Sequence, residues 1–204
     1  MKKVVIVGKT RMHGGICVGG LVESTAEPVR LIPYGSSWNT QDTPFMLGDI
    51  WELELTSQAG ATPPHVEDHY FTDHKKVGVV PNLRDWILSK VVPWQGATIN
   101  LFDGALQYRK GGTAYVPTTG NVSKYSTGFW ILPVNLVYIT IKNRPKYQLS
   151  ALNEIILPYV GCQPVIPTIL SGSLVRLSLA RPWTGPDAPV DEDKRHSLQL
   201  SGWY

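Results

Sequence analysis

Residues 49–56 have the sequence Asp-Ile-Trp-Glu-Leu-Glu-Leu-Thr, in which apolar and acidic side chains alternate. Trp51, Leu53 and Leu55 fall on one side of an extended chain, and the glutamates at 52 and 54 fall on the other. This period of two predicts a β-strand with one buried face. An apolar strand face must pack against another layer, so the stretch favours a fold built from sheets.

Further strand-like segments lie on both sides of this stretch, and glycine or proline often brackets them. The chain has 19 glycines and 16 prolines among 204 residues, which argues against a helix bundle because both residues interrupt helices. Aromatic residues make up 10% of the chain and charged residues only 17%, a composition that excludes disorder. The predicted strands span residues 3–8, 16–18, 28–33, 49–56, 65–71, 106–109, 114–117, 128–142, 173–180 and 197–204.

Residues 82–90 are the best candidate for a helix. Asn82 can cap this helix, Leu83, Trp86 and Ile87 share one face, and Pro93 ends it. The apolar side chains of residues 150–160 are also helically spaced, so this segment is a candidate for a second short helix.

About five strands and one helix in each half are typical of an OB-type barrel. We therefore predict a mainly β chain, in which two OB-like small β-barrels are packed as one unit with one or two short helices. The first barrel would span residues 1–95 and the second residues 96–204. A single β-sandwich is the alternative.

The sequence lacks the features of a membrane protein or of a common enzyme. No apolar run approaches the roughly 18 residues of a membrane span. The two cysteines, Cys17 and Cys162, belong to no Cys-x-x-Cys motif, so we expect reduced thiols, no cofactor and a cytoplasmic location. Residues 4–10 are similar to part of a P-loop, but Lys3 stands where that motif needs glycine. A Gly-x-Ser-x-Gly motif is absent too, and we expect no catalytic activity.

Basic residues are concentrated in one part of the chain. Residues 1–95 are nearly neutral, whereas residues 96–186 hold eight lysines and arginines against only Asp103 and Glu154, a net charge of +6. Aromatic residues stand beside several cations of the second half. Cations neutralise phosphates and aromatic rings stack on bases, so the pattern predicts a surface for nucleic acid or a nucleotide. An ordinary solvated basic face is the alternative.

Nine residues are predicted to make these contacts. The first barrel would contribute Lys9, Arg11 and Arg30, and the second would contribute Arg109, Lys110, Arg176, Arg181, Trp183 and Trp203. The polar segment 34–48 is predicted to be a long loop, and long loops often carry binding sites.

A cluster of potential metal ligands lies in residues 65–74. On a strand, His65, Glu67 and His69 would point the same way and could form a site of two histidines and one carboxylate. The spacing matches neither His-Glu-x-x-His nor His-x-x-Glu-His, so a polar strand face is the favoured interpretation.

Several motifs along the chain resemble the prokaryotic dual OB-containing domain family. They are Gly8-Lys9-Thr10-Arg11-Met12, Gly15-Ile16-Cys17-Val18-Gly19-Gly20, Val29-Arg30-Leu31, Gly48-Asp49-Ile50-Trp51-Glu52, Pro63-Pro64-His65-Val66-Glu67-Asp68 and Leu198-Gln199-Leu200-Ser201-Gly202-Trp203-Tyr204. The resemblance implies two OB-like barrels. It also implies an association with bacterial conflict or antiphage systems, in which the module senses or binds nucleic acid or nucleotides. It carries over no catalytic residues.

Three functions follow as hypotheses. The first is a non-catalytic recognition component that binds nucleic acid or a nucleotide beside a partner effector, without contact to a membrane. The second is a protein–protein adaptor that docks an effector enzyme through its aromatic and arginine side chains. The third is a metal-dependent nuclease or phosphodiesterase that uses the histidine and acid cluster.

Overall fold

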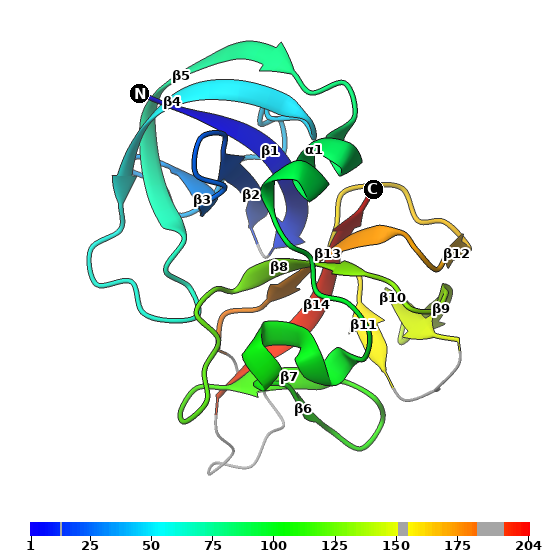
Figure 1. The fold of residues 1–204 in the computed structure, drawn as a ribbon. Helices are drawn as coiled ribbons and strands as arrows, with labels where there is room; N and C mark the ends of the chain where they lie inside the picture. Colours follow the sequence, from blue (N-terminus) through cyan, green and yellow to red (C-terminus); the bar gives the residue numbers. More distant parts are fainter. Residues whose placement is uncertain (13, 151–154, 183–193) are drawn as a thin grey trace. The chain divides into compact units, whose positions relative to one another are not determined.

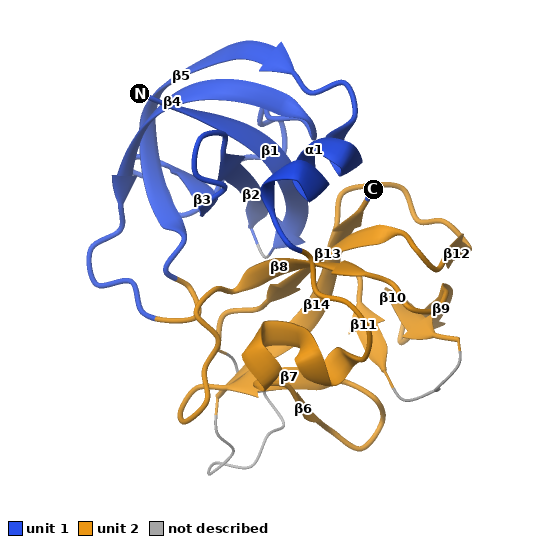
Figure 2. Ribbon diagram, viewed as in Figure 1, with its two compact units in different colours: residues 1–62, 66–92, 204 blue, residues 63–65, 93–203 orange. Residues whose placement is uncertain are grey.

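The computed structural model describes residues 1–12, 14–150, 155–182 and 194–204. The chain divides into two compact units, which Figure 2 colours separately. Unit 1 comprises residues 1–62 and 66–92 together with Tyr204, and unit 2 comprises residues 63–65 and 93–203. The division does not follow the sequence strictly. Residues 63–65 belong to unit 2 although the residues on both sides of them belong to unit 1, and Tyr204 belongs to unit 1 although the residue before it belongs to unit 2.

Unit 1 is a closed barrel of five strands in the order β1-β2-β3-β5-β4. The long first strand pairs antiparallel with both β2 and β4, which closes the ring. Strands β3 and β5 run parallel. The bounds are β1 (Lys2–Met12), β2 (Gly15–Val22), β3 (Pro28–Pro33), β4 (Asp49–Ser57) and β5 (Asp68–Val79), and Figure 1 shows β1, β4 and β5 curving around the unit.

Close packing between β1 and β2 depends on Gly20. This residue lies opposite Ile6, where the register of the pair begins to shift. A Cβ atom at residue 20 would lie 2.3 Å from a methyl group of Val4, which is well inside the distance of ordinary contact. Val4 and Ile6 are fully buried, so only glycine lets the two strands approach around these side chains.

The predicted helix at residues 82–90 is confirmed. Helix α1 (Leu83–Lys90) follows Asn82, whose side-chain oxygen accepts a hydrogen bond from the backbone N–H of Asp85 at 3.1 Å. Ile87 is fully buried and anchors the helix. Within the part of the chain that the structure describes, no helix is long and apolar enough to cross a membrane.

Unit 2 contains two sheets. The strand order is β6-β7-β14-β13-β8 in the larger sheet and β11-β10-β9-β12 in the smaller one. A parallel bridge between Tyr159 and Leu200 connects the two sheets, and the N–H of Val160 donates to the carbonyl of Leu200 at 3.0 Å. The bounds are β6 (Gln107–Tyr108), β7 (Ala114–Pro117), β8 (Thr127–Ile131), β9 (Leu136–Ile141), β10 (Arg144–Leu149), β11 (Ile156–Pro158), β12 (Thr168–Ile169), β13 (Leu174–Leu179) and β14 (Arg195–Trp203).

The mainly β prediction is confirmed, and so is the OB-like barrel, which the structure shows closed in unit 1. Three local predictions need correction. The strand expected from residue 65 begins at Asp68 and runs to Val79. The strand expected over 128–142 is divided into β8 and β9 by a break around Pro133.

The third correction concerns the helix expected over residues 150–160. Within the described part of this segment, Ile156–Pro158 form β11, because Leu157 pairs with Tyr147 of β10 and both side chains are buried. Pairing with the preceding strand therefore outweighs the helical spacing. Residues 151–154 lie outside the described residues. Among the described residues, the second helix is instead the short 3-10 helix η1 (Thr98–Gly104), which is kinked at Leu101, Phe102 and Asp103.

Candidate nucleic-acid interface

Two arginines lie over one tyrosine ring in unit 2. The guanidinium carbon of Arg195 is 4.6 Å from the ring centre of Tyr115, and that of Arg109 is 5.6 Å from it. Tyr115 lies on β7, between β6 and the beginning of β14. Its hydroxyl donates a hydrogen bond to the side-chain oxygen of Gln107 at 2.8 Å, which fixes the orientation of the ring. The sheet thus brings cations from two distant segments to one aromatic side chain.

The turn between β6 and β7 adds a further cation. The backbone N–H of Arg109 donates to the carbonyl of Thr113 at 2.9 Å, and the chain reverses through Gly111 and Gly112. Both glycines have a positive φ, 98° and 83°, a conformation that suits glycine. Lys110 is exposed in this turn, and Lys194 is exposed just before β14.

We call Arg109, Lys110, Tyr115, Lys194 and Arg195 the Tyr115 cluster. It combines four cationic side chains with one oriented ring. Such a set can contact phosphates through the cations, and a base can stack on a guanidinium plane above the ring. A cation over an aromatic face contributes about 0.5–1 kcal/mol at an exposed site, so the arginines are also partly ordered before any ligand binds.

Arg109 and Lys110 were predicted contact residues, whereas Tyr115 and Arg195 were missed as partners. Asp191, Glu192 and Asp193 stand just before Arg195 in the sequence, so local composition favours a loop that includes this arginine. In the structure Arg195 is the first residue of β14, opposite Pro117. The sequence holds one signal for this, because the alternation of Leu198 and Leu200 with polar residues extends back to His196, and the structure buries all three side chains.

In unit 1, two of the predicted cations lie near the end of β1. The ammonium group of Lys9 is 4.0 Å from the sulfur of Met46, and Arg11 is exposed opposite Ile16 of β2. The structure thus leaves both side chains at the surface of the barrel or close to it.

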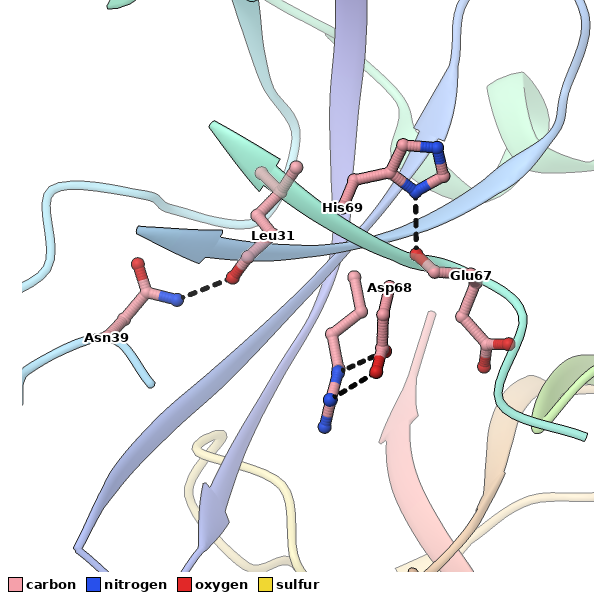
Figure 3. Close-up of polar contacts among 6 residues, drawn as sticks. Leu31, Asn39, Glu67, Asp68 and His69 are labelled. Atoms are coloured by element: carbon pink, nitrogen blue, oxygen red, sulfur yellow. Dashed lines mark hydrogen bonds and ion pairs between the residues drawn. The ribbon is translucent and has the colours of Figure 1, made fainter. Parts of the chain in front are cut away.

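Arg30 is held inside the wall of the barrel instead. Its Nε and Nη2 lie 2.6 and 2.7 Å from the two carboxylate oxygens of Asp68, and the two residues are also paired in the β3–β5 register. Asp68 is almost fully buried, and Figure 3 shows two dashed contacts that end at its carboxylate oxygens. Burial lowers the pKa of Arg30, but the charges of Cys17, Asp68 and Glu67 outweigh this effect, so the net pKa is raised. With its charge matched by Asp68, Arg30 serves chiefly to join β3 to β5.

Arg176 and Trp203 also have partners within unit 2. Arg176 is buried, and its Nη1 donates to the hydroxyl of Ser201 at 3.1 Å. That hydroxyl in turn donates to the backbone carbonyl of Arg176 at 2.9 Å. Trp203 is half-buried and packs against Tyr159 with ring centres 5.1 Å apart. Both side chains therefore stabilise the sheet around β14.

The last two predicted residues follow β13. Arg181 is exposed and contributes to the electrostatic environment of His196. Trp183 lies outside the described residues.

The residues of the predicted metal site do not share one strand face. His65 belongs to unit 2 and precedes β5, whereas Glu67 and His69 belong to unit 1. Both ring nitrogens of His69 already have partners. Nδ1 is 2.9 Å from the carbonyl of Glu67 (Figure 3), and Nε2 is 3.1 Å from the hydroxyl of Ser57. Among the residues that the structure describes, no group of three histidine, cysteine or acidic side chains could hold a metal ion.

A closed five-stranded barrel in which β1 pairs with both β2 and β4 defines unit 1 as an OB-type domain. The chain belongs to the dual OB-containing domain family, whose sequence model matches residues 2–203. The resemblance found in the sequence motifs is thereby confirmed.

Comparison with solved structures finds distant likenesses over nearly the whole chain. One is described as "Crystal structure of p204 HINb domain", with 12% identity, coverage of 98% of this chain and 95% of that chain, and a TM-score of 0.34. Another is "Crystal structure of Ifi202 HINa domain in complex with 20bp dsDNA", with 11% identity, the same coverages and a TM-score of 0.32. A third is "Structure of murine DNA binding protein bound with ds DNA", with 8% identity, coverages of 99% and 95%, and a TM-score of 0.31. Comparison with curated proteins finds no match.

Proposed function

We propose that this protein is a non-catalytic recognition component that binds nucleic acid through the Tyr115 cluster. The observation that carries the proposal is the placement of Arg109 and Arg195 over one tyrosine ring, at 5.6 and 4.6 Å. Lys110 follows Arg109 in the sequence and Lys194 precedes Arg195, so each arginine has a second cation beside it. Membership of the dual OB-containing domain family supports the proposal, because OB barrels present loops and sheet faces to oligonucleotides.

The chemistry of the Tyr115 cluster suits a single strand. Guanidinium groups bind phosphate oxygens through paired N–H donors, and an aromatic ring stacks on any base at about 1–3 kcal/mol. A single strand exposes phosphates and bases together, whereas a duplex hides its base faces. Binding should therefore depend on salt without strong sequence preference.

The proposal includes a biological setting. The motif resemblance supports a role in a prokaryotic defence system, with an effector enzyme as the partner that acts on what this protein recognises. The adaptor function competes with nucleic-acid binding at the same cluster, because tyrosine and arginine are also common anchors of protein interfaces.

The test compares the double variant Arg109→Gln, Arg195→Gln with the control Arg144→Gln, which removes one exposed arginine from β10. We expect the wild-type chain to bind a single strand of about 15 nucleotides, with affinity that falls steeply with salt. The double variant should bind about tenfold more weakly, and its salt slope should be smaller by about 1.4, since each lost phosphate contact accounts for about 0.7. The control should resemble the wild type.

Equal affinities and slopes for all three proteins would overturn the role of the Tyr115 cluster. Absence of binding by the wild type would overturn nucleic-acid recognition itself. Capture of a partner that survives nuclease treatment and is lost in the double variant would favour the adaptor function.

A further inference from the structure

Unit 1 contains a pocket of about 400 Å³ that none of the predicted contact residues lines. Its wall is the connection between β3 and β4, including Trp38, Asn39, Thr40 and Asp42, and its other side is formed by Phe71 and His74 of β5. The volume lies within the range of small-molecule sites, about 300–1,000 Å³. The pocket therefore has the size to receive a small ligand or one unit of a polymer.

The loop that forms the wall is fixed to the barrel. Asn39 exchanges backbone hydrogen bonds with Ile16 of β2, at 2.8 and 3.2 Å. Its side-chain amide donates to the carbonyl of Leu31 at 2.8 Å, a contact that Figure 3 displays. Three hydrogen bonds from a buried residue hold this part of the loop, so the wall of the pocket is already formed without a ligand.

The indole of Trp38 rests on glycine backbone. A Cβ atom at Gly15 would lie 2.3 Å from the Cδ1 atom of Trp38, so only glycine permits this contact. Gly14 supports the other end of the indole, where a Cβ atom would lie 3.0 Å from the ring. Trp38 retains 40% of its surface exposed and lines the pocket, so the ring is both positioned and available for stacking.

The opposite side of the pocket is aromatic as well. The ring centres of Phe45 and Phe71 are 5.4 Å apart in an edge-to-face arrangement, and the rings of Phe71 and His74 are 5.5 Å apart. Phe45 and Phe71 are buried and rigidly packed, whereas His74 is exposed. Trp38, Phe71 and His74 thus line the pocket with aromatic rings, which favours a flat, partly apolar ligand.

The polar groups of the pocket select against an anion. The residues that line it include one carboxylate, Asp42, and neither lysine nor arginine. The hydroxyl of Thr40 donates to this carboxylate at 2.5 Å and, as the largest cause, lowers the pKa of Asp42. The carboxylate is thus ionised at neutral pH, repels phosphate and accepts hydrogen bonds from N–H donors.

We propose that this pocket binds an amino-bearing nucleobase, with the base stacked on Trp38 and its exocyclic amine donating to Asp42. A carboxylate that accepts from the N4 amine of cytosine is a recurrent means of base recognition. This inference rests on the proposed function for its biological meaning, since the base can belong to a bound strand. No lysine or arginine lines the pocket, so recognition of the base should not need a phosphate and should extend to a free nucleoside.

The test uses cytidine and uridine, which have nearly the same shape. Cytidine carries an amine at C4 and an acceptor nitrogen at N3, whereas uridine carries a carbonyl oxygen at C4 and an N–H at N3. Isothermal titration of the full chain should show cytidine binding about tenfold more tightly than uridine. The variant Asp42→Asn should lose this preference, because an amide presents both a donor and an acceptor. The control Asp73→Asn changes an exposed aspartate of β5 outside the pocket and should keep the preference.

A second arm identifies the source of the base. Strands of about 12 deoxycytidines or thymidines are compared at high salt, where phosphate contacts weaken. Loss of a deoxycytidine preference in Asp42→Asn assigns the pocket to a base within a strand. A preference confined to the nucleosides assigns it to a free nucleoside, and either result supports the pocket.

Failure of the pocket and failure of the proposed function have different signatures. Absence of nucleoside binding, equal binding of cytidine and uridine by the wild type, or a preference that survives Asp42→Asn overturns the pocket. None of these results changes the salt-dependent binding assigned to the Tyr115 cluster. Conversely, the double variant of the Tyr115 cluster should bind cytidine as the wild type does.

Discussion

The Nε2 atom of His65 lies 3.2 Å from the Nδ1 atom of His196, and both rings are buried in unit 2. The same Nδ1 atom is 3.1 Å from the backbone carbonyl of Ala180. A carbonyl only accepts, so the proton belongs on Nδ1 of His196, which donates to both neighbours. His65 must then accept at Nε2, so this nitrogen carries no proton and the ring of His65 is neutral.

This arrangement predicts that acid destabilises unit 2. Burial is the largest cause that lowers the pKa of His196, the charge of Arg181 lowers it further, and the hydrogen bond to Ala180 opposes the shift. Because the folded pKa is below that of the unfolded chain, the unfolded state binds more protons as the pH falls below about 6.5. The free energy of unfolding should therefore decrease from pH 7.5 towards pH 5.

Chemical unfolding between pH 5 and pH 8 checks this prediction. The variant His196→Asn keeps an N–H donor but cannot take up a proton, and its unfolding free energy should decrease less below pH 6.5. Between pH 7.5 and pH 8 the unfolding free energy of both proteins should hardly change with pH, because histidine is neutral in both states there. This range serves as the internal control. An identical acid dependence in the two proteins would show that His196 does not cause it.

The pair of Arg30 and Asp68 predicts a large loss of stability when one partner is removed. Asp68 has 2% of its side chain exposed and Arg30 has 23%, so the charges are only partly hydrated. Asp68→Asn removes the carboxylate that pairs with the partly buried guanidinium and should cost about 2–4 kcal/mol.

The matched comparison is the double variant Arg30→Met, Asp68→Leu. It removes both charges together, so its cost in unfolding free energy should be smaller than that of Asp68→Asn. Denaturant unfolding of the single and double variants measures the difference. If the double variant were as unstable as the single one, packing and not charge pairing would explain the role of the two residues.

Gly15 predicts a link between barrel packing and the pocket. Gly15→Ala would place a Cβ atom 2.3 Å from Trp38 and 2.5 Å from the backbone oxygen of Asn39. Backbone cannot move as easily as a flexible side chain, so the cost should be about 1–3 kcal/mol. The displaced indole should also weaken cytidine binding.

Gly78→Ala is the control for this substitution. A Cβ atom at Gly78 would meet Ile50 at 3.5 Å, an ordinary contact, so stability and cytidine binding should change little. Thermal unfolding and titration calorimetry of the two variants provide both measurements. Equal stabilities of the two variants would contradict the steric argument.

Much of unit 1 is predictable from local sequence patterns. The alternation over residues 49–56 matches β4 (Asp49–Ser57) to within one residue, and Asn82 marks the start of α1. Both predictions succeed because burial alternates along a strand and because a cap bonds to residues next to it in sequence. The loop nature of residues 34–48 was also predictable, but the pocket it forms depends on contacts with β2 and β5 that no local pattern contains.

The candidate sites show where sequence patterns are insufficient. Arg30 and Arg176 are cationic residues of the kind that contact phosphates. In the structure, however, each is hydrogen-bonded to a side chain 25 or more positions away, Asp68 and Ser201 respectively. Charge in the sequence indicates that a residue is cationic and not whether a buried partner already matches it.

The sequence by itself determined that this protein is built mainly of short strands and that its excess of positive charge is concentrated in residues 96–186, because both follow from composition and from side chains close together along the chain. Only the tertiary structure decided that Arg195 lies over Tyr115, that His65 meets His196, and that Trp38 rests on Gly15. These contacts arise from pairing between distant strands and from loops folded back on the barrel. Such contacts depend on the three-dimensional register of the strands, which local periodicity does not specify.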